Sequence, residues 1–308
     1  MAIAPNSTTP HPGPPLQLYL AHFGLKEAPF SLTPDTAYFY PHRGAQAAFN
    51  TLQVALHTGE GFIKIVGEVG CGKTLLCRRL LASLGADFIS AYIPNPNMGA
   101  DDILLALCDE LGLTIPTHAG NHRILTRLRR CLVGHAQQGK RVVLCIDEAQ
   151  SIPLPTLESL RLLSNLETEK QKLLQIVLFG QPELDDKLAR PEIRQLQQRI
   201  TFSDYLSPLT PHDLPTYLSH RLQVAGAAHE SLFTPAAIQS LARYSNGVPR
   251  LTNIIAHKAL MLAYGEGVSE IQPRHIEGAA IDTPAARTPS LKQRLRGWVQ
   301  RHHLMAAP

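Results

Sequence analysis

Two patterns of hydrophobic and polar residues succeed each other along the chain. Short apolar runs rich in Val and Ile predict buried strands, and stretches with apolar residues every three or four positions predict amphipathic helices. The predicted strands are 62–66, 88–93, 141–146, 174–179 and 200–205. The predicted helices are 43–57, 73–84, 100–111, 122–138, 155–167, 182–189 and 193–198. Strands that alternate with helices favour an α/β fold with a parallel sheet flanked by helices.

The pattern changes after the last predicted strand. From 211 to 281 the periodicity is helical and predicts no strand, and helix-start signals stand at Thr210, Thr234 and Pro273. We therefore expect an α/β core followed by a small all-helical lid domain. The expected segments are a disordered proline-rich lead at 1–16, the core at 17–206, the lid at 207–283 and a tail at 284–308.

Composition narrows the class of protein. The 308 residues contain 44% hydrophobic residues and no apolar run long enough for a membrane-spanning helix. The five cysteines form no C-x-x-C pair, which favours a reducing, cytoplasmic location. The net charge is +4, but residues 283–308 hold five Lys and Arg and no acid, so the remainder has 24 basic and 25 acidic residues. A near-neutral body argues against a globally basic nucleic-acid-binding domain.

A glycine-rich turn follows the first predicted strand. Residues 67–74, "GEVGCGKT", fit the pattern G-x-x-x-x-G-K-[ST]. Glycines let the backbone wrap a phosphate, and the amide N–H groups and the helix N-terminus supply positive potential. Lys73 is expected to reach the β- and γ-phosphates, and the Thr74 hydroxyl to hold Mg²⁺. The expected nucleotide-binding residues are Gly67, Glu68, Val69, Gly70, Cys71, Gly72, Lys73 and Thr74.

A carboxylate pair ends another predicted strand. In "RVVLCIDEAQ", Asp147 and Glu148 directly follow an apolar run, which disfavours a pair of ordinary surface carboxylates. Asp147 is expected to hold the magnesium ion, and Glu148 to polarise an attacking water. A carboxylate poised for water favours ATP hydrolysis over phosphoryl transfer to a metabolite.

Further polar residues are candidates for contact with the γ-phosphate. Gln181 follows the predicted strand 174–179, where it is either a hydrogen-bond donor to the phosphate or water, or a turn residue before Pro182. Arg194 and Arg199 precede the last strand, and Arg250 follows a Gly-Val-Pro turn in the helical region. Arg194 and Arg199 are either candidates to reach the γ-phosphate of a neighbouring subunit or part of a solvated helix face, and Arg250 would close over the phosphates of its own subunit.

These elements in this order resemble AAA+ ATPases. Over about residues 17–283 the chain is similar to the ExeA/GspA-type and MshM-type ATPases of type II secretion and MSHA-type type IV pilus biogenesis. The segments that carry the resemblance are "YLAHFGLKEAPFSLTPDTAYFY", "GEVGCGKT", "IDEAQ", "LRLLSNLETEKQKLLQIVLFGQPEL", "RQLQQRI" and "GVPRLTN". It is more distantly similar to TniB-type transposition ATPases and origin-binding AAA+ proteins.

The resemblance implies roles for individual residues. Lys73 and Thr74 would be the Walker A residues, and Asp147 and Glu148 the Walker B residues. Gln181 would occupy the sensor-1 position. Arg199 would be the arginine finger, with Arg194 as the alternative, and Arg250 the sensor-2 arginine. The family also implies ATP and Mg²⁺ as ligands and a homo-oligomeric ring such as a hexamer, with sites at subunit junctions.

The resemblance implies a function and leaves an alternative. It implies an ATPase that drives assembly of a bacterial envelope machine with inner-membrane pilus or secretion proteins. The alternative is a DNA-engaging ATPase of the transposition or origin-binding type, which the near-neutral body does not favour. The ExeA type continues into a transmembrane helix and a peptidoglycan-binding region. Neither is present in this sequence, so we expect the shorter MshM-like type.

Three features outside the expected site remain open. The tail "SLKQRLRGWVQRHHL" has an apolar stripe amid basic residues, which suits contact with an anionic membrane surface, a partner or DNA, or a solvated end. Cys71 is either a tolerated small residue or a thiol with a lowered pKa near a helix N-terminus. The aromatic segment before residue 41 is expected to pack against the nucleotide domain, with one ring as a candidate cover for adenine. Its members are Phe23, Pro29, Phe30, Phe39 and Tyr40.

Overall fold

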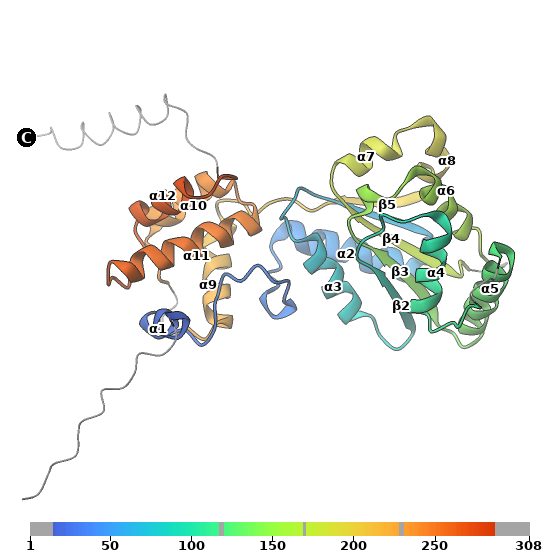
Figure 1. Cartoon of the computed structure of the whole chain (residues 1–308), viewed down its shortest axis with the longest axis horizontal. Coiled ribbons are helices and arrows are strands. Elements are labelled where there is room, and N and C mark those ends of the chain that lie inside the picture. The colour runs from blue at the N-terminus through green and yellow to red at the C-terminus, as the bar shows by residue number, and fades with distance from the viewer. Residues whose placement is uncertain (1–14, 117–119, 169–170, 228–230, 287–308) are drawn as a thin grey trace, which may run out of the picture. The chain divides into compact units, whose positions relative to one another are not determined.

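The computed structural model describes residues 15–116, 120–168, 171–227 and 231–286. The described chain divides into two compact units, one of which combines the dark blue N-terminal segment of Figure 1 with the orange and red helices. One unit is formed by residues 34–208. The other combines residues 15–33 with residues 209–286. No helix within the described ranges is both long and apolar enough to span a membrane.

The first unit contains a parallel sheet of five strands, which confirms the predicted fold class. The strand order is β2-β3-β4-β1-β5, and every neighbouring pair is parallel. The strands are β1 (Phe62–Val66), β2 (Phe88–Ile93), β3 (Arg141–Ile146), β4 (Leu174–Gly180) and β5 (Ile200–Tyr205). Because all strands run in one direction, the polar residues that follow β1, β3 and β4 meet at the same edge of the sheet.

Helices cover both faces of this sheet (Figure 1). Successive residues of β3 alternate between two core clusters, with Leu144 on one face and Val143 and Cys145 on the other. Burial on both faces explains why the strands read as nearly continuous apolar runs. The helices are α2 (Arg43–Thr58), α3 (Lys73–Ser83), α4 (Ala100–Glu110), α5 (Asn121–Gln137), α6 (Leu154–Leu163), α7 (Glu183–Leu188) and α8 (Arg194–Gln197). The short 3-10 helices are η1 (Thr36–Tyr38), η2 (Ala149–Ser151) and η3 (Pro191–Ile193).

The second unit is helical. Its helices are α1 (Pro15–His22), α9 (Asp213–Val224), α10 (Pro235–Ser245), α11 (Pro249–Gly265) and α12 (Pro273–Ile281). Thr234 caps α10 by accepting a hydrogen bond from Ala237 N, as expected of a helix-start residue. In addition, Phe233 and Ile271 form one isolated β-bridge.

The aromatic segment before residue 34 packs differently from our expectation. Tyr19 lies edge-on to His257 and Tyr264 of α11, and Phe30 lies edge-on to Phe233. Arg221 of α9 also donates a hydrogen bond to the Pro29 carbonyl. Residues 15–33 therefore belong to the helical unit, whereas we had assigned residues from 17 onward to the nucleotide domain.

Phe39 follows the expectation for the same aromatic segment. Its ring packs against the α/β core on the face of the sheet that α2 and α3 cover. Arg79 of α3 lies over this ring, 6.0 Å from its centroid. The aromatic segment is thus divided between the two units.

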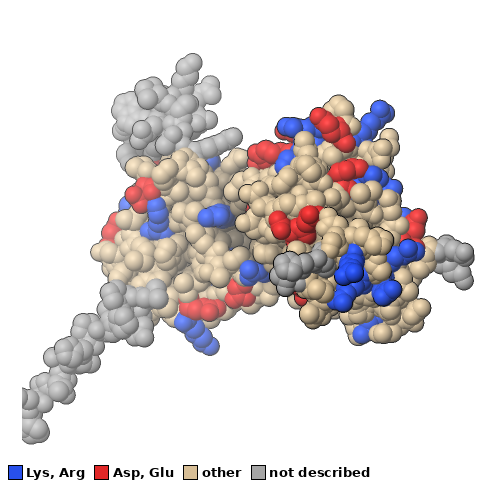
Figure 2. Space-filling model, turned by 45° about the vertical axis from the view of Figure 1, so that its right-hand side comes forward, with Lys and Arg blue, Asp and Glu red and all other residues tan. Residues whose placement is uncertain are grey.

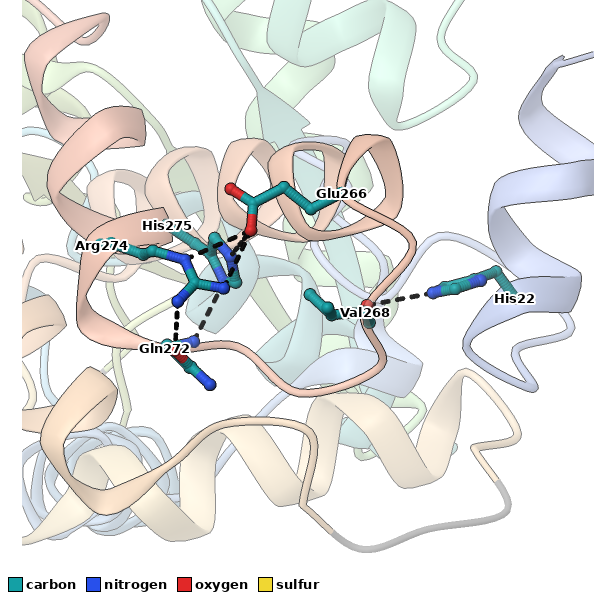
Figure 3. Close-up of polar contacts among 6 residues, drawn as sticks. All are labelled: His22, Glu266, Val268, Gln272, Arg274 and His275. Carbon is teal, nitrogen blue, oxygen red and sulfur yellow. Dashed lines mark hydrogen bonds and ion pairs between the residues drawn. The ribbon is translucent and has the colours of Figure 1, made fainter.

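A polar network joins α11 to α12 in the helical unit (Figure 3). Glu266 Oε2 accepts hydrogen bonds from Arg274 Nη2 at 2.9 Å and from His275 Nε2 at 3.1 Å. His275 Nδ1 accepts from Gln272 N at 3.1 Å, so both ring nitrogens of this buried histidine are bonded. The loop between the helices also accepts a hydrogen bond from His22 Nε2 at Val268 O, 3.0 Å away.

Candidate functional site

The loop between β1 and α3 has the backbone of a phosphate cradle. A Cβ atom on Gly67 would lie 2.8 Å from the Leu206 carbonyl oxygen, so a larger residue would push the loop off β5. Gly72 has φ of 99°, a left-handed conformation that favours glycine, and it stands directly before the first residue of α3. The first amide groups of α3 have no acceptor within the helix, and the helix dipole favours an anion beside them.

Lys73 is folded back onto this loop. Its buried ammonium group donates to Gly67 O at 2.7 Å and to Glu68 O at 3.0 Å. Burial lowers the pKa of Lys73, and the nearby charge of Glu148 opposes that shift. A phosphate in the loop would compete with these two carbonyls for the ammonium group, and it would supply the counter-charge that the carbonyls lack.

Thr74 and Asp147 bring a hydroxyl and a carboxylate together at the edge of the sheet. Thr74 Oγ1 donates to Asp147 Oδ2 at 2.6 Å, and Asp147 Oδ1 accepts from Glu148 N at 2.9 Å. Burial raises the pKa of Asp147, while the hydrogen bonds from Thr74 and Glu148 N oppose the shift.

The same pair fits a magnesium ion. A hydroxyl and a carboxylate are ligands of the kind that Mg²⁺ takes from a protein when it keeps several waters and phosphate oxygens. The described residues hold no cluster of three or more His, Cys, Asp or Glu side chains that would form an all-protein cage. Thr74 and Asp147 could supply two of the ligands of an ion whose remaining ligands are water and phosphate oxygens.

Glu148 and Gln181 come together from the ends of β3 and β4. Gln181 Nε2 donates to Glu148 Oε2 at 3.0 Å, so the neighbouring strands β3 and β4 bring these two residues together. Glu148 has φ of 51°, and only Asn246 shares a positive φ among the described non-glycine residues. Strained backbone of this kind is concentrated at functional sites.

Gln150 is a member of this cluster that the sequence analysis missed. Its Nε2 donates to Glu148 Oε2 at 2.6 Å, and its Oε1 accepts from Gln181 N at 3.0 Å. The signal in the sequence was its position two residues after Glu148 in "IDEAQ", within a turn that follows a buried strand.

Cys71 is buried inside the loop. Burial raises the pKa of its thiol to about 11, and the charge of Lys73 opposes this shift only in part. The thiol is therefore protonated at neutral pH. The hypothesis of a lowered thiol pKa at this helix N-terminus is wrong, because desolvation outweighs the favourable charge.

The three candidate arginines lie apart from this cluster or in the other unit. Arg199 is half-buried and donates to Ser164 Oγ at 2.8 Å, just past the end of α6. Arg194 is exposed at the first position of α8. Arg250 is exposed at the second position of α11 in the helical unit. The residues that meet at the sheet edge are Lys73, Thr74, Asp147, Glu148, Gln150 and Gln181.

Residues 56–188 match the family described as the AAA domain. The matched range begins in α2 and ends with α7, so it includes the phosphate loop, the carboxylate pair and Gln181. The chain is also 43% identical over 270 residues to General secretion pathway protein A of Aeromonas hydrophila. That alignment covers 88% of this chain and 49% of the relative, so the chain spans about half the length of the curated relative that it matches.

Solved structures with the same fold include two archaeal proteins. The ORC2 protein of Aeropyrum pernix, in ADPNP–ADP complexes, has a TM-score of 0.62 at 18% identity and covers 92% of this chain and 75% of its own. Cdc6p of Pyrobaculum aerophilum has a TM-score of 0.59 at 18% identity, over 82% of this chain and 69% of its own. At such identities the likeness establishes the fold alone.

Proposed function

The chain belongs to the AAA+ family of P-loop ATPases, and on that premise we propose that it hydrolyses Mg-ATP to drive assembly of a bacterial envelope machine. The machine would be a type II secretion system or an MSHA-type type IV pilus. The observation that carries the hydrolytic part is the Glu148–Gln181 pair beside Thr74 and Asp147. The likeness to General secretion pathway protein A supports the cellular part.

The phosphate loop would bind the nucleotide. Lys73 would exchange the carbonyls of Gly67 and Glu68 for β- and γ-phosphate oxygens. Thr74 and Asp147 would hold a magnesium ion, whose charge neutralises that of the phosphates. The backbone amides of residues 68–74 would contribute the remaining positive potential.

Glu148 would act on the attacking water. Its Oε2 accepts two amide hydrogen bonds, and within the described ranges its Oε1 accepts none. Oε1 would therefore take the proton that the water loses as its oxygen attacks the γ-phosphorus. Gln181, with its amide at the same edge of the sheet, would orient the water or the γ-phosphate.

The arginines would complete the site in an oligomer. We propose a homo-oligomeric ring such as a hexamer, in which Arg199 or Arg194 reaches the γ-phosphate bound to a neighbouring subunit, and Arg250 acts as the sensor-2 arginine. Arg199 would exchange its hydrogen bond to Ser164 for this contact, whereas Arg194 is already exposed. Turnover by the isolated subunit would then be slow.

We further propose a place at the cytoplasmic side of the inner membrane, with pilus or secretion assembly proteins as partners. The basic tail, which would touch the membrane surface, lies outside the described residues. Lys and Arg are interspersed with Asp and Glu on the face that Figure 2 shows, rather than gathered as one sign over it. This mixture supports a protein partner over DNA.

The test is ATP turnover by the purified protein with and without duplex DNA, with Glu148→Gln as the blank. We expect turnover that depends on Glu148 and changes less than twofold with DNA. Strong stimulation by DNA would replace the envelope-assembly proposal with the transposition or origin-binding alternative. In cells, a chromosomal Glu148→Gln substitution is expected to abolish surface pili or secreted proteins.

A further inference from the structure

We propose that Gln150 is a positioning residue for hydrolysis, which aims the Glu148 carboxylate and links it to the end of β4. The inference rests on the proposed ATPase function, because it assigns a role in the same site. Gln150 would not touch the nucleotide; it would act through Glu148.

The two hydrogen bonds on Glu148 converge on one oxygen. Gln150 Nε2 and Gln181 Nε2 lie 2.6 Å and 3.0 Å from Glu148 Oε2. Two donors on one oxygen fix the rotation of the carboxylate. The other oxygen, Oε1, has no donor in the described part of the chain, so it is the one presented to a water.

Gln150 uses both ends of its side-chain amide. While Nε2 holds Glu148, Oε1 accepts from Gln181 N at 3.0 Å. The turn η2, which contains Gln150, is thereby joined to the residue that follows β4. Lys187 of α7 holds the same turn by donating to Gln150 O and, at 2.7 Å, to Ile152 O.

The backbone at Glu148 makes this support necessary. Its φ of 51° is a conformation that a residue with a Cβ adopts only when its surroundings impose it. Ser151 N and Ser151 Oγ donate to Glu148 O at 2.9 Å and 2.8 Å, which fixes the main chain. Gln150 fixes the side chain. The main chain and the side chain of Glu148 are therefore both held by residues of one short turn.

Gln150 also has a role that Gln181 cannot fill alone. When a γ-phosphate draws on the Gln181 amide, Glu148 loses one of its two donors. Gln150 remains bonded to Oε2 and to Gln181 N, so the carboxylate keeps its direction while Gln181 turns toward the phosphate.

The experiment compares Gln150→Ala and Gln150→Glu with wild type, with Gln137→Ala, an exposed glutamine of α5, as the matched control. Gln150→Glu preserves the acceptor for Gln181 N and removes the donor to Glu148. The readouts are kcat and KM for Mg-ATP, the Kd for Mg-ADP, and Tm.

For Gln150→Ala we expect kcat to fall by about 10- to 100-fold, the cost of a misplaced catalytic group. KM and the Kd for Mg-ADP should stay within twofold of wild type, and Gln137→Ala should match wild type. Gln150→Glu should lose at least as much kcat as Gln150→Ala, because it removes the donor to Glu148 and its carboxylate repels that of Glu148.

Three outcomes would overturn the proposal: a kcat for Gln150→Ala within twofold of wild type, a loss of kcat matched by losses in Kd and Tm, or wild-type kcat in Gln150→Glu. Glu148→Gln separates this failure from failure of the proposed function. If Glu148→Gln is inactive and Gln150→Ala is active, only the role of Gln150 is wrong. If Glu148→Gln turns over as fast as wild type, both are wrong.

Discussion

Two glutamates, one in each unit, accept several hydrogen bonds on a single carboxylate oxygen. Glu148 in the α/β unit is held by the neutral amides of Gln150 and Gln181. Glu266 in the helical unit is held by Arg274 and His275 (Figure 3). Their backbones differ as well, since Glu148 has φ of 51° and Glu266 has φ of −84°.

The comparison shows that charged and neutral hydrogen-bond donors prepare a carboxylate for different roles. Arg274 supplies a counter-charge, and the bonds from His275 and Arg274 lower the pKa of Glu266. Such a carboxylate joins two helices and has no strong tendency to accept a proton. The amides around Glu148 orient its carboxylate without adding a counter-charge, and they leave one oxygen open. The first arrangement stabilises a loop, and the second suits a general base.

Removal of the carboxylate at Glu148 should slow ATP hydrolysis and leave nucleotide binding nearly unchanged. For Glu148→Gln we expect turnover to fall by about 10²- to 10⁴-fold, the usual contribution of a general base. Binding of Mg-ATP should persist, because Lys73 and Thr74 are untouched. Steady-state phosphate release and nucleotide titration measure the two quantities, and a variant that turns over at the wild-type rate would contradict the role of Glu148.

Asp147→Asn should separate stability from activity at the neighbouring position. Burial raises the pKa of Asp147, so its charge opposes folding at pH values above that pKa, and the opposition weakens as the pH falls through it. We expect loss of Mg-dependent turnover together with a Tm above that of wild type, because the substitution removes a buried charge. Thermal unfolding at pH 7 provides the check, and a lower Tm would show that the carboxylate stabilises the fold.

Glu266→Gln should produce the opposite result in the helical unit. The pKa of Glu266 is lowered in the folded state, so its contribution to stability is present above the ordinary pKa of about 4.5 and is lost as the pH falls through the folded value. We expect the Tm at pH 7 to fall by at most a few degrees, since the carboxylate is half exposed. The difference from wild type should disappear in acid, and turnover should not change. A difference in Tm that does not shrink as the pH falls below about 4.5 would contradict the electrostatic reason.

Cys71→Ser should have the smallest effect of the four substitutions. Because burial raises the pKa of the Cys71 thiol to about 11, the thiolate is scarce at neutral pH and reacts slowly with alkylating agents. We expect turnover of Cys71→Ser within twofold of wild type. Turnover of the native protein should also survive brief treatment with iodoacetamide. Rapid inactivation that Cys71→Ser prevents would show that the thiol is reactive.

Local patterns were sufficient to predict the sheet and the phosphate loop. Strand β3 is an apolar run after Arg141, and Asp147 follows it directly, so both the strand and the polar edge can be read from adjacent positions. The loop is likewise a continuous motif with a strand before it and a helix after it. Such features depend on residues that are neighbours along the chain, so periodicity and spacing were informative.

Contacts between distant segments could not be predicted in this way. The bond between Gln150 and Gln181 spans 31 positions, and the bond from Arg199 to Ser164 spans 35. The part of the aromatic segment before residue 34 was assigned to the wrong unit, because Phe30 meets Phe233, about 200 residues later, and a ring can pack equally well on either core. Tertiary packing decides such pairs, and no local pattern encodes them.

Parallel measurement of ATP turnover and Tm for wild type, Glu148→Gln and Glu266→Gln decides whether the two glutamates have different tasks. We expect Glu148→Gln to lose turnover by at least 100-fold with little change in Tm, and Glu266→Gln to lose Tm with wild-type turnover. Equal turnover in wild type and Glu148→Gln would contradict the assignment of Glu148 as the base. The chain would then bind ATP without using Glu148 to hydrolyse it.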